Sequence, residues 1–289
     1  MTTSPLSALT LIAPAKLNLF LHINGRRHDG YHELETLFTF LDYGDELSFE
    51  LTANKTISLL GDTKGIADED NLIFKAATLL QQHRQVNKGA KISLVKRLPM
   101  GGGVGGGSSD AASTLLGLNK LWQCGLTIEQ LAALGLQLGA DVPVFIRGTS
   151  AIAHGIGEQL QPVQLEKKWY CVVHPNQHVS TAKIFTHPDL KRDTPKLSKL
   201  WQHEVLSNDC EPLVKKLCPE VEKTLQWLLK YAPSKMTGTG SCCFVEFDTQ
   251  VQAQDVLADL PPNWQGFVAA NTNISPAHSR LSAMFDDPN

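Results

Sequence analysis

The stretch that decides the fold reads LPMGGGVGGGSSDAASTLLGL and covers residues 98–118. Six of the seven residues in 101–107 are glycine. Such a run adds no side chains to a core, but it leaves backbone N–H groups accessible and permits positive φ. Before it, apolar and polar residues alternate over residues 91–98, which predicts a strand.

The residues after the glycine run predict a helix. Ser108, Ser109 and Asp110 are of types that cap helices, and a helix-forming run follows them through Trp122. A strand, a glycine loop and a helix N-terminus hold phosphate well, because free N–H groups and the helix dipole both favour an anion. The sequence therefore predicts a loop for the phosphates of a nucleoside triphosphate.

Other interpretations of this loop can be weighed. A Walker A loop requires lysine after its last glycine, where this chain has Ser108, so that interpretation fails. Gly101, Gly103 and Gly106 fit the dinucleotide pattern G-x-G-x-x-G of nicotinamide-dependent oxidoreductases, although so dense a run matches almost automatically. A flexible linker is the remaining alternative, against which the flanking strand and helix argue.

The composition is that of a soluble globular protein with one large domain or two closely packed ones. The 289 residues are 42% hydrophobic and 19% charged, with a formal charge of -3. No basic stripe points to nucleic acid, and no apolar run approaches the roughly 20 residues that span a bilayer. The six cysteines form no C-x-x-C pair, which favours reduced thiols and a cytoplasmic location.

The first part of the chain predicts an antiparallel sheet. Residues 13–23 alternate so that Lys16 and Asn18 share a face with Phe20 and His22, a mixture more typical of a cleft lining than of a solvent face. Another alternating stretch follows Tyr31 and His32, runs through Phe40 and is expected to end at residues 42–45. Further strands are expected near residues 46–51 and 56–60, followed by a helix after acidic residues 68–70. His28 and His32 are not interpreted as metal ligands, because Gly30 interrupts a helix and no carboxylate partner is evident.

Asp141 admits two interpretations. Thr127 and Gln130 form a capping box for a helix that ends at Gly139. Asp141 follows, with Pro143 two residues later, which is typical of a helix N-cap. A carboxylate between a glycine and an apolar run is equally a rigid mount for a catalytic base, and both interpretations stay open.

The second half predicts a split βαβ order, and hence a ferredoxin-like domain, with a lysine-rich polar excursion near residues 191–199. The expected strands lie near residues 150–154, 169–174, 242–247 and 266–270, and the expected helices near 180–185, 218–231 and 251–260.

Three stretches resemble, in order, the three motifs of the GHMP kinases: residues 14–18, 99–109 and 237–241. Supporting residues lie at 29–32, 42–45, 70–72 and 139–145, and the similarity runs from about residue 13 to 276. The resemblance implies an α+β, two-domain GHMP kinase fold. Residues 1–155 would form the ATP-binding domain and residues 156–289 a ferredoxin-like domain, with a cleft between them.

The resemblance also implies an activity: ATP-dependent phosphorylation of a hydroxyl in the methylerythritol unit of a small cytidine diphosphate substrate, for isoprenoid precursors. Lys16 and Asp141 would be the catalytic pair, with Asp141 taking the hydroxyl proton and Lys16 neutralising charge on the moving phosphoryl group. Whether Asp141 is a true base or an electrostatic positioner stays open.

The implied binding residues fall into two groups. Asn71 and Lys96 would lie near the adenine and the glycine loop would cradle the phosphates, with Gly240 and Ser241 near the same region. Tyr31, His32 and Phe185 would hold the cytosine. The ATP-binding residues are Asn71, Lys96, Pro99, Met100, Gly101, Gly102, Gly103, Val104, Gly105, Gly106, Gly107, Ser108 and Ser109, and the substrate-binding residues are Asn18, Tyr31, His32, Thr181 and Phe185.

Mg²⁺ is expected with the ATP phosphates, with Ser108 and Ser109 as the ligand candidates and no acidic ligand identified. Mevalonate-type and homoserine-type kinases are the alternatives within the superfamily, disfavoured by Tyr31, His32 and Phe185. A nucleotide-binding member without activity would lack Lys16 or Asp141, and both are present. The oligomeric state does not follow from the sequence.

Overall fold

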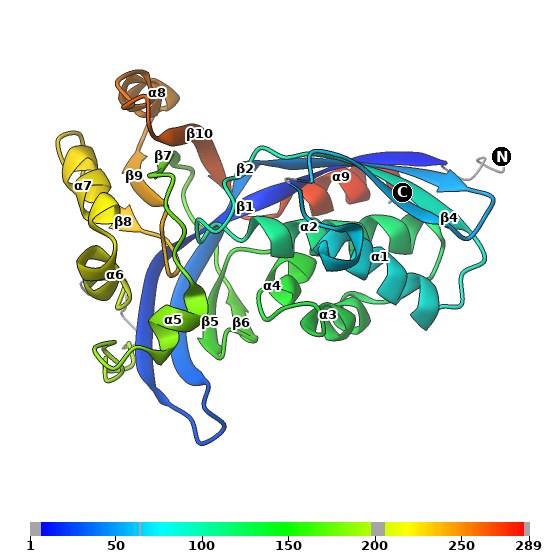
Figure 1. The fold of residues 1–289 in the computed structure, drawn as a ribbon, viewed down its shortest axis with the longest axis horizontal. Coiled ribbons are helices and arrows are strands. Elements are labelled where there is room, and N and C mark those ends of the chain that lie inside the picture. The colour runs from blue at the N-terminus through cyan, green and yellow to red at the C-terminus, as the bar shows by residue number, and fades with distance from the viewer. Residues whose placement is uncertain (1–6, 64, 198–205, 286–289) are drawn as a thin grey trace.

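The computed structural model describes residues 7–63, 65–197 and 206–285. Two long antiparallel strands, β1 (Ala8–Arg26) and β2 (His32–Thr52), run through both halves of the molecule (Figure 1). The predicted strand over 13–23 is confirmed as part of β1. The pairing of β1 with β2 shifts register between Pro14 and Lys16 and again between Asn18 and Phe20. Such bulges re-aim side chains, here beside the glycine loop.

The two stretches expected to separate at residues 42–45 form one strand. Gly44 lies opposite Pro14 in the β1–β2 pair, and a Cβ on Gly44 would stand 2.0 Å from the carbonyl oxygen of Ala13. Glycine therefore permits a close backbone approach inside the strand, and does not end it.

The N-terminal half is a mixed sheet. Strand β4 (Gly89–Val95) and strand β5 (Ala151–Gly155) both pair antiparallel with β2, and β6 (Gln159–Pro162) pairs with β5. Strand β3 (Ile57–Gly61) pairs parallel with β4, so the expected antiparallel arrangement of residues 56–60 is wrong. A parallel pair needs a crossover connection. The turn η1 (Asp68–Asp70) and helix α1 (Leu72–His83) supply it.

Helices cover one face of this sheet (Figure 1). They are α1, α2 (Gly106–Leu121), α3 (Ile128–Leu136) and α4 (Val142–Arg147), joined by α9 (Pro276–Phe285) from the end of the chain. Leu281 of α9 is buried in the core of the N-terminal half. The division of the chain at residue 155 stays a prediction. Helix α9 was expected in the C-terminal domain, but it packs against the N-terminal half.

The C-terminal half has the predicted ferredoxin-like topology. Its antiparallel strands have the order β8 (Lys235–Met236), β9 (Cys243–Phe247), β7 (Trp169–His174) and β10 (Gln265–Thr272). Its helices are α5 (Thr181–Thr186), α6 (Glu211–Leu217), α7 (Pro219–Leu228) and α8 (Gln250–Ala258). Strand β10 also pairs with β2, which joins the two halves into one sheet.

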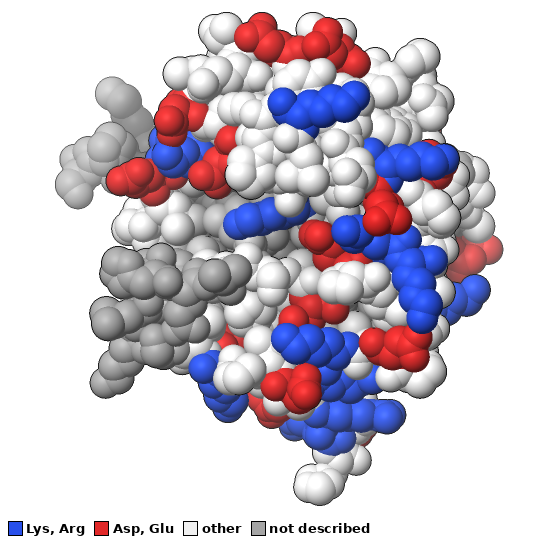
Figure 2. All heavy atoms as spheres, turned by 90° about the vertical axis from the view of Figure 1, so that its left-hand side faces the viewer, with Lys and Arg blue, Asp and Glu red and all other residues white. Residues whose placement is uncertain are grey.

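The outer face of the C-terminal half carries interspersed basic and acidic side chains (Figure 2). Strand β6 and helices α6 and α9 are elements that the sequence patterns did not predict. In the described part of the chain, no helix is long and apolar enough to cross a membrane.

Candidate active site

The glycine loop connects β4 to α2 and adopts left-handed backbone at alternate residues. Gly101, Gly103 and Gly105 have φ of 68°, 79° and 75°. Gly105 is the N-cap of α2, so the helix begins at Gly106 inside the glycine run. The expectation that Ser108, Ser109 and Asp110 cap this helix is therefore wrong: they lie in the helix itself. Because the N-cap and the first two residues of α2 are glycine, the backbone N–H groups at the helix start are unscreened by side chains and suit phosphate.

Close backbone contacts explain why this loop needs glycine. A Cβ on Gly103 would stand 2.5 Å from the carbonyl oxygen of Thr237, and one on Gly105 would stand 2.6 Å from the ring of Phe145. The N–H of Lys16 donates to the carbonyl of Val104 at 2.9 Å. Strand β1 and the loop before β9 thus hold the glycine loop from both sides.

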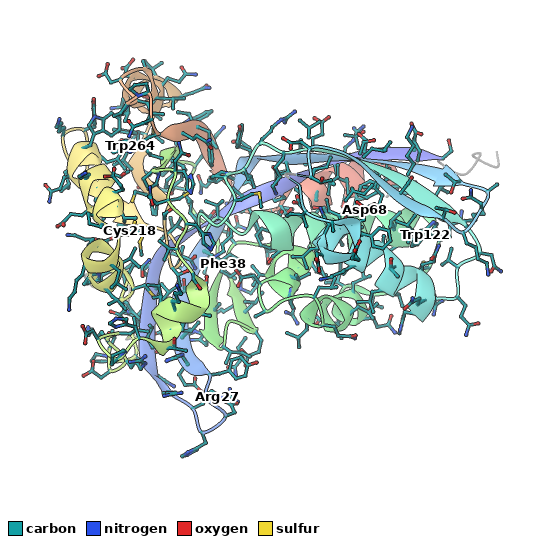
Figure 3. The ribbon with its side chains drawn as sticks, in the orientation of Figure 1. Arg27, Phe38, Asp68, Trp122, Cys218 and Trp264 are labelled. Carbon is teal, nitrogen blue, oxygen red and sulfur yellow. The ribbon has the colours of Figure 1, made fainter. Side chains whose placement is uncertain are left out.

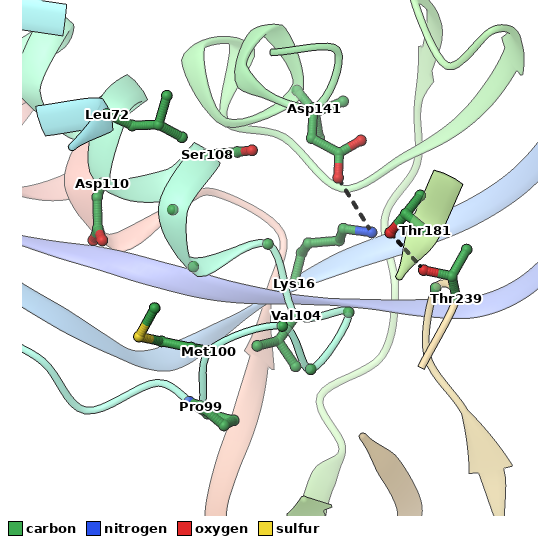
Figure 4. A pocket seen from close by; sticks show the side chains of 18 of the residues that line it. Lys16, Leu72, Pro99, Met100, Val104, Ser108, Asp110, Asp141, Thr181 and Thr239 are labelled. Atoms are coloured by element: carbon green, nitrogen blue, oxygen red, sulfur yellow. Dashed lines mark hydrogen bonds and ion pairs between the residues drawn. The ribbon is translucent and has the colours of Figure 1, made fainter. Parts of the chain in front are cut away.

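Lys16 projects from β1 next to this loop (Figure 4). Its ammonium donates to Asn18 Oδ1 at 2.5 Å and lies 3.9 Å from Asp141 Oδ2. The Asn18 amide in turn donates to the hydroxyl of Thr36 at 2.9 Å. The Lys16 side chain is 10% exposed and that of Asp141 is 56% exposed. The arrangement places a fixed cation beside an accessible carboxylate.

Asp141 stands at the N-cap position of α4, but its side chain does not cap the helix. Asp141 occupies the N-cap position of α4, but its φ of -82° and ψ of -16° are helical. A capping side chain requires an extended N-cap residue. Within α4, whose residues are all described, the Asp141 side chain accepts no capping hydrogen bond.

The third motif meets the glycine loop from the C-terminal half. Gly238 and Thr239 line the same cavity as the glycine loop. Thr239 shares a hydrogen bond of 2.8 Å with Thr181 at the start of α5 (Figure 4). Ser241 is fully buried and bonds to the carbonyl of Gln177. Gly238 and Thr239 are thus the motif residues that line this cavity, and the expected Gly240 lies against the glycine loop, where its carbonyl oxygen would stand 3.0 Å from a Cβ on Gly103.

Lys96 belongs to a buried cluster with two carboxylates. Its ammonium donates to Asp45 Oδ2 at 2.6 Å and to Asp110 Oδ2 at 2.7 Å. Asp45 Oδ1 accepts the N–H groups of Arg97 and Leu98. The cluster therefore ties the start of the glycine loop to helix α2.

The charges of this cluster perturb one another. Burial raises the pKa of Asp110 to about 7, and the negative Asp45 adds to that effect while Lys96 opposes it. Burial alone would lower the pKa of Lys96, but Asp110 and Asp45 outweigh it and raise the pKa. In effect, three groups of net charge -1 when fully ionised share a site with little water.

Two of the expected cytosine residues, Tyr31 and His32, lie at the tip of the β1–β2 hairpin, which also carries Arg27 (Figure 3), and the third, Phe185, belongs to α5. The rings of His32 and Phe185 are 5.2 Å apart. Phe185 lines the cavity, whereas His32 and Tyr31 are not among its lining residues, and Tyr31 is 58% exposed in the hairpin turn. His32 also accepts a hydrogen bond of 2.9 Å from Arg192.

Lys16, Asp141 and the glycine loop line a cavity of about 580 Å³. It brings together most of the predicted residues: Lys16, Asn18, Asn71, Lys96, Pro99, Met100, Gly101, Gly102, Gly103, Val104, Gly105, Gly106, Gly107, Ser108, Asp141, Thr181 and Phe185. Ser109 is fully buried beside it, and Asn71 caps α1 through a 2.9 Å bond from the N–H of Ile73.

Sequence reasoning missed several residues of this site. Thr36 and Asp110 line the cavity, and Arg192 contacts His32. Asp110 gave a signal, an acidic residue next to a phosphate loop, which was interpreted as a cap. Arg192 gave none, because its partner is 160 positions away in the chain. Among the described residues, no group of three or more His, Cys, Asp or Glu side chains could hold a metal ion.

The fold and this site define a class of protein. The family model "GHMP kinases N terminal domain" matches residues 71–149, and "GHMP kinases C terminal" matches residues 191–265. This chain belongs to the GHMP kinases.

Its relatives are more specific. The chain is 76% identical over 281 residues to the 4-diphosphocytidyl-2-C-methyl-D-erythritol kinase of Pseudoalteromonas translucida (strain TAC 125), covering 97% of this chain and 99% of that protein. A crystal structure of 4-(cytidine 5'-diphospho)-2C-methyl-D-erythritol kinase superposes with a TM-score of 0.79 at 32% identity, covering 91% and 99% of the two chains. A homoserine kinase from Cytophaga hutchinsonii shares the fold, with a TM-score of 0.67 at 16% identity over 96% and 98% of the chains.

Proposed function

We propose that this chain transfers the γ-phosphoryl group of ATP to a hydroxyl of 4-diphosphocytidyl-2-C-methyl-D-erythritol, giving the 2-phosphate, in non-mevalonate isoprenoid precursor synthesis. The observation that carries the proposal is the position of Lys16. Its ammonium lies between Asn18 and Asp141, and its Cγ would stand 3.2 Å from a Cβ on Gly105 of the glycine loop. The cation thus sits where a bound phosphate would meet an alcohol. The proposal includes a cytoplasmic location, where ATP is available.

ATP would bind along the glycine loop. The backbone N–H groups of the loop and of the first turn of α2 would hold its phosphates. Asn71, Lys96, Pro99 and Met100 line the part of the cavity beyond the loop, and this part would hold the adenosine.

The chemistry follows from the Lys16–Asp141 pair. The substrate hydroxyl oxygen forms a bond to the γ-phosphorus as the bond to the β,γ-bridging oxygen breaks, and ADP leaves. Asp141 would accept the hydroxyl proton, since its carboxylate is exposed to the cavity and is not used as a cap. Lys16 would offset the charge on the phosphoryl oxygens.

The cytidine would lie at the Phe185 side of the cavity. A flat aromatic ring stacks on a pyrimidine with about 1–3 kcal/mol per base. Phe185 offers such a ring, and His32 beside it offers a polar edge. Asn18 and Thr181 line the space between this side and the glycine loop, where the methylerythritol unit would lie.

Mg²⁺ is part of the proposal as a companion of ATP. Ser108 lines the cavity and offers a hard oxygen donor of the kind that Mg²⁺ prefers, whereas Ser109 is fully buried beside it. The described residues hold no group of three or more ligating side chains, which fits an ion bound mainly through phosphates and water. When bound, Mg²⁺ supplies charge neutralisation between phosphate oxygens.

The test is an assay of ADP release with the purified chain, ATP and Mg²⁺. The acceptors are 4-diphosphocytidyl-2-C-methyl-D-erythritol, mevalonate, homoserine and galactose. We expect saturable turnover with the cytidine substrate alone and a phosphorylated product by mass spectrometry. Preference for another acceptor would refute the proposed substrate, and ADP release equal to that without acceptor would refute the kinase.

A further inference from the structure

Arg192 is held so that one edge of its guanidinium meets His32. Its Nε–H donates to His32 Nε2 at 2.9 Å. Its terminal N–H groups donate to three backbone carbonyls in and after α5: Leu190 at 3.0 Å, Phe185 at 2.9 Å and His187 at 2.7 Å. Arg192 therefore connects His32 to the chain segment that carries Phe185.

The segment around Arg192 is fastened to the long hairpin. The N–H of Thr194 donates to the carbonyl of Ile23 at 3.1 Å, and its hydroxyl donates to Asp209 Oδ2 at 2.7 Å. Further along, the N–H of Leu197 donates to Glu35 Oε2 at 2.8 Å. Both carboxylates are buried. These bonds leave the guanidinium little freedom to move away from His32.

This contact determines which nitrogen of His32 carries its proton. Arginine does not lose its proton in proteins and can only donate hydrogen bonds. His32 Nε2 must then present its lone pair, which places the proton of a neutral ring on Nδ1. Burial lowers the pKa of His32, and the positive Arg192 and Arg26 add to that effect, which favours the neutral ring.

We propose that Arg192 is a positioning residue that fixes His32 as the Nδ1–H tautomer and thereby sets the preference for cytosine over uracil. The inference rests on the proposed cytidine site. Among the described residues, no hydrogen bond uses His32 Nδ1, and the ring of His32 lies 5.2 Å from that of Phe185, which lines the cavity.

The two pyrimidines differ at the position that a single donor can distinguish. Cytosine presents a lone pair at N3, whereas uracil carries a hydrogen there. An Nδ1–H donor forms a hydrogen bond with N3 of cytosine, whereas in uracil it faces the N3–H group, a second donor. A polar group left unpaired in a closed site costs binding free energy. If the proton of His32 moved to Nε2, Nδ1 would become an acceptor and the preference would weaken.

The experiment compares the parent with Arg192→Met and Arg192→Lys, each as the full chain. Long-range ¹H–¹⁵N spectra of ¹⁵N-histidine-labelled protein report the protonation of each ring nitrogen. We expect Nδ1 protonated and Nε2 unprotonated in the parent, and loss of that pattern in Arg192→Met. The ratio of kcat/KM for the cytidine substrate to that for its uridine analogue should fall roughly 10- to 100-fold.

The control is Lys191→Met, which removes the neighbouring positive charge, paired with Asp209 at 3.6 Å, without touching His32. It should keep the tautomer and the ratio. A parent His32 protonated on Nε2 would overturn the proposal, and this measurement needs no variant to fold. An unchanged tautomer in both Arg192 variants would overturn it as well.

A separate titration distinguishes failure of the cytidine site. Cytidine diphosphate added to the labelled parent should shift the His32 signals, and inorganic phosphate should not. If the His32 signals do not shift while the substrate is still turned over, the cytidine site is misplaced. The role of Arg192 in the preference for cytosine is then also refuted, whichever tautomer His32 has.

Discussion

The carboxylate of Asp141 lies 3.9 Å from the ammonium of Lys16, on a residue that stands at a helix N-cap with helical backbone angles. A residue serving α4 as a cap would be extended and would accept a backbone N–H. Asp141 instead directs its carboxylate toward the cavity. The local sequence left cap and base equally open, and the geometry favours the second.

Asp141→Asn is therefore expected to damage turnover and to leave stability intact. Asparagine keeps the shape but cannot take the hydroxyl proton, so kcat should fall by roughly 10²–10⁴-fold. No capping bond is lost, so Tm should stay near that of the parent. Steady-state ADP release at saturating ATP, with a thermal melt alongside, makes the comparison. Near-parental kcat would remove the base assignment.

Lys16→Met tests the other half of the pair. It removes the charge and the bond to Asn18 while keeping an unbranched apolar stem. We expect most of the turnover to be lost, and the double variant to be little worse than the poorer single variant, because the two groups act as a unit. Lys75→Met, which removes an exposed lysine paired with Asp70, is the control. Multiplying losses in the double variant would mean that the residues act independently.

Gly103→Ala should raise the KM for ATP more than Gly125→Ala, a variant with similar backbone strain outside the loop. The added Cβ meets the Thr237 carbonyl at 2.5 Å and would push the loop out of position. Gly125→Ala is the matched control: Gly125 has a similarly positive φ of 67°, but nothing lies within 4 Å of an added Cβ. Both variants should lose about 1 kcal/mol of stability through strain at positive φ. Equal KM values in the two would argue against the phosphate cradle.

Much of this site could be predicted from the sequence because its motifs are contiguous. The glycine loop, its flanking strand and helix, and Lys16 with Asn18 on one strand face all follow from residues a few positions apart. The same reasoning failed where a glycine had an unexpected role. Gly44 permits a close strand approach, and Gly105 with Gly106 moves the start of α2 ahead of the apparent capping residues.

Residues joined only by the fold could not be predicted. Asp45, Lys96 and Asp110 come from β2, the loop after β4 and helix α2, and no periodicity relates them. Arg192 reaches His32 only because the segment after α5 is fastened against the hairpin. The packing of α9 against the N-terminal half has the same origin, since it depends on where β10 ends in space.

Phe185→Ala should weaken the cytidine substrate and spare ATP. Removing a stacking ring is expected to raise the KM for the cytidine substrate by roughly 5- to 150-fold, since stacking contributes about 1–3 kcal/mol per base. In the described structure, no hydrogen bond joins Phe185 to the glycine loop, so the KM for ATP should change less than about twofold. Equal losses for the two ligands would place the cytidine elsewhere or indicate a folding defect.

Asp110 is 4% exposed and shares the Lys96 ammonium with Asp45. Its pKa is raised from 3.8 to about 7 in the folded protein, first by burial and then by the charge of Asp45. Between those two values, the folded state holds a proton that the unfolded state has released. The contribution to stability is therefore fully present below the unfolded pKa and is lost as the pH rises through the folded pKa.

Asp110→Asn should remove this dependence, because asparagine stays neutral at every pH. From pH 5 to pH 7, the unfolding free energy of the parent should fall relative to the variant by up to about 1.4 kcal/mol per pH unit. Urea unfolding at half-unit steps from pH 5 to 8 measures the difference, in which titrations common to both proteins cancel. Glu50→Gln, which removes an exposed carboxylate paired with Lys91, controls for the loss of a surface charge. A difference between Asp110→Asn and the parent that is constant from pH 5 to 8 would mean that Asp110 stays ionised beside Lys96 throughout.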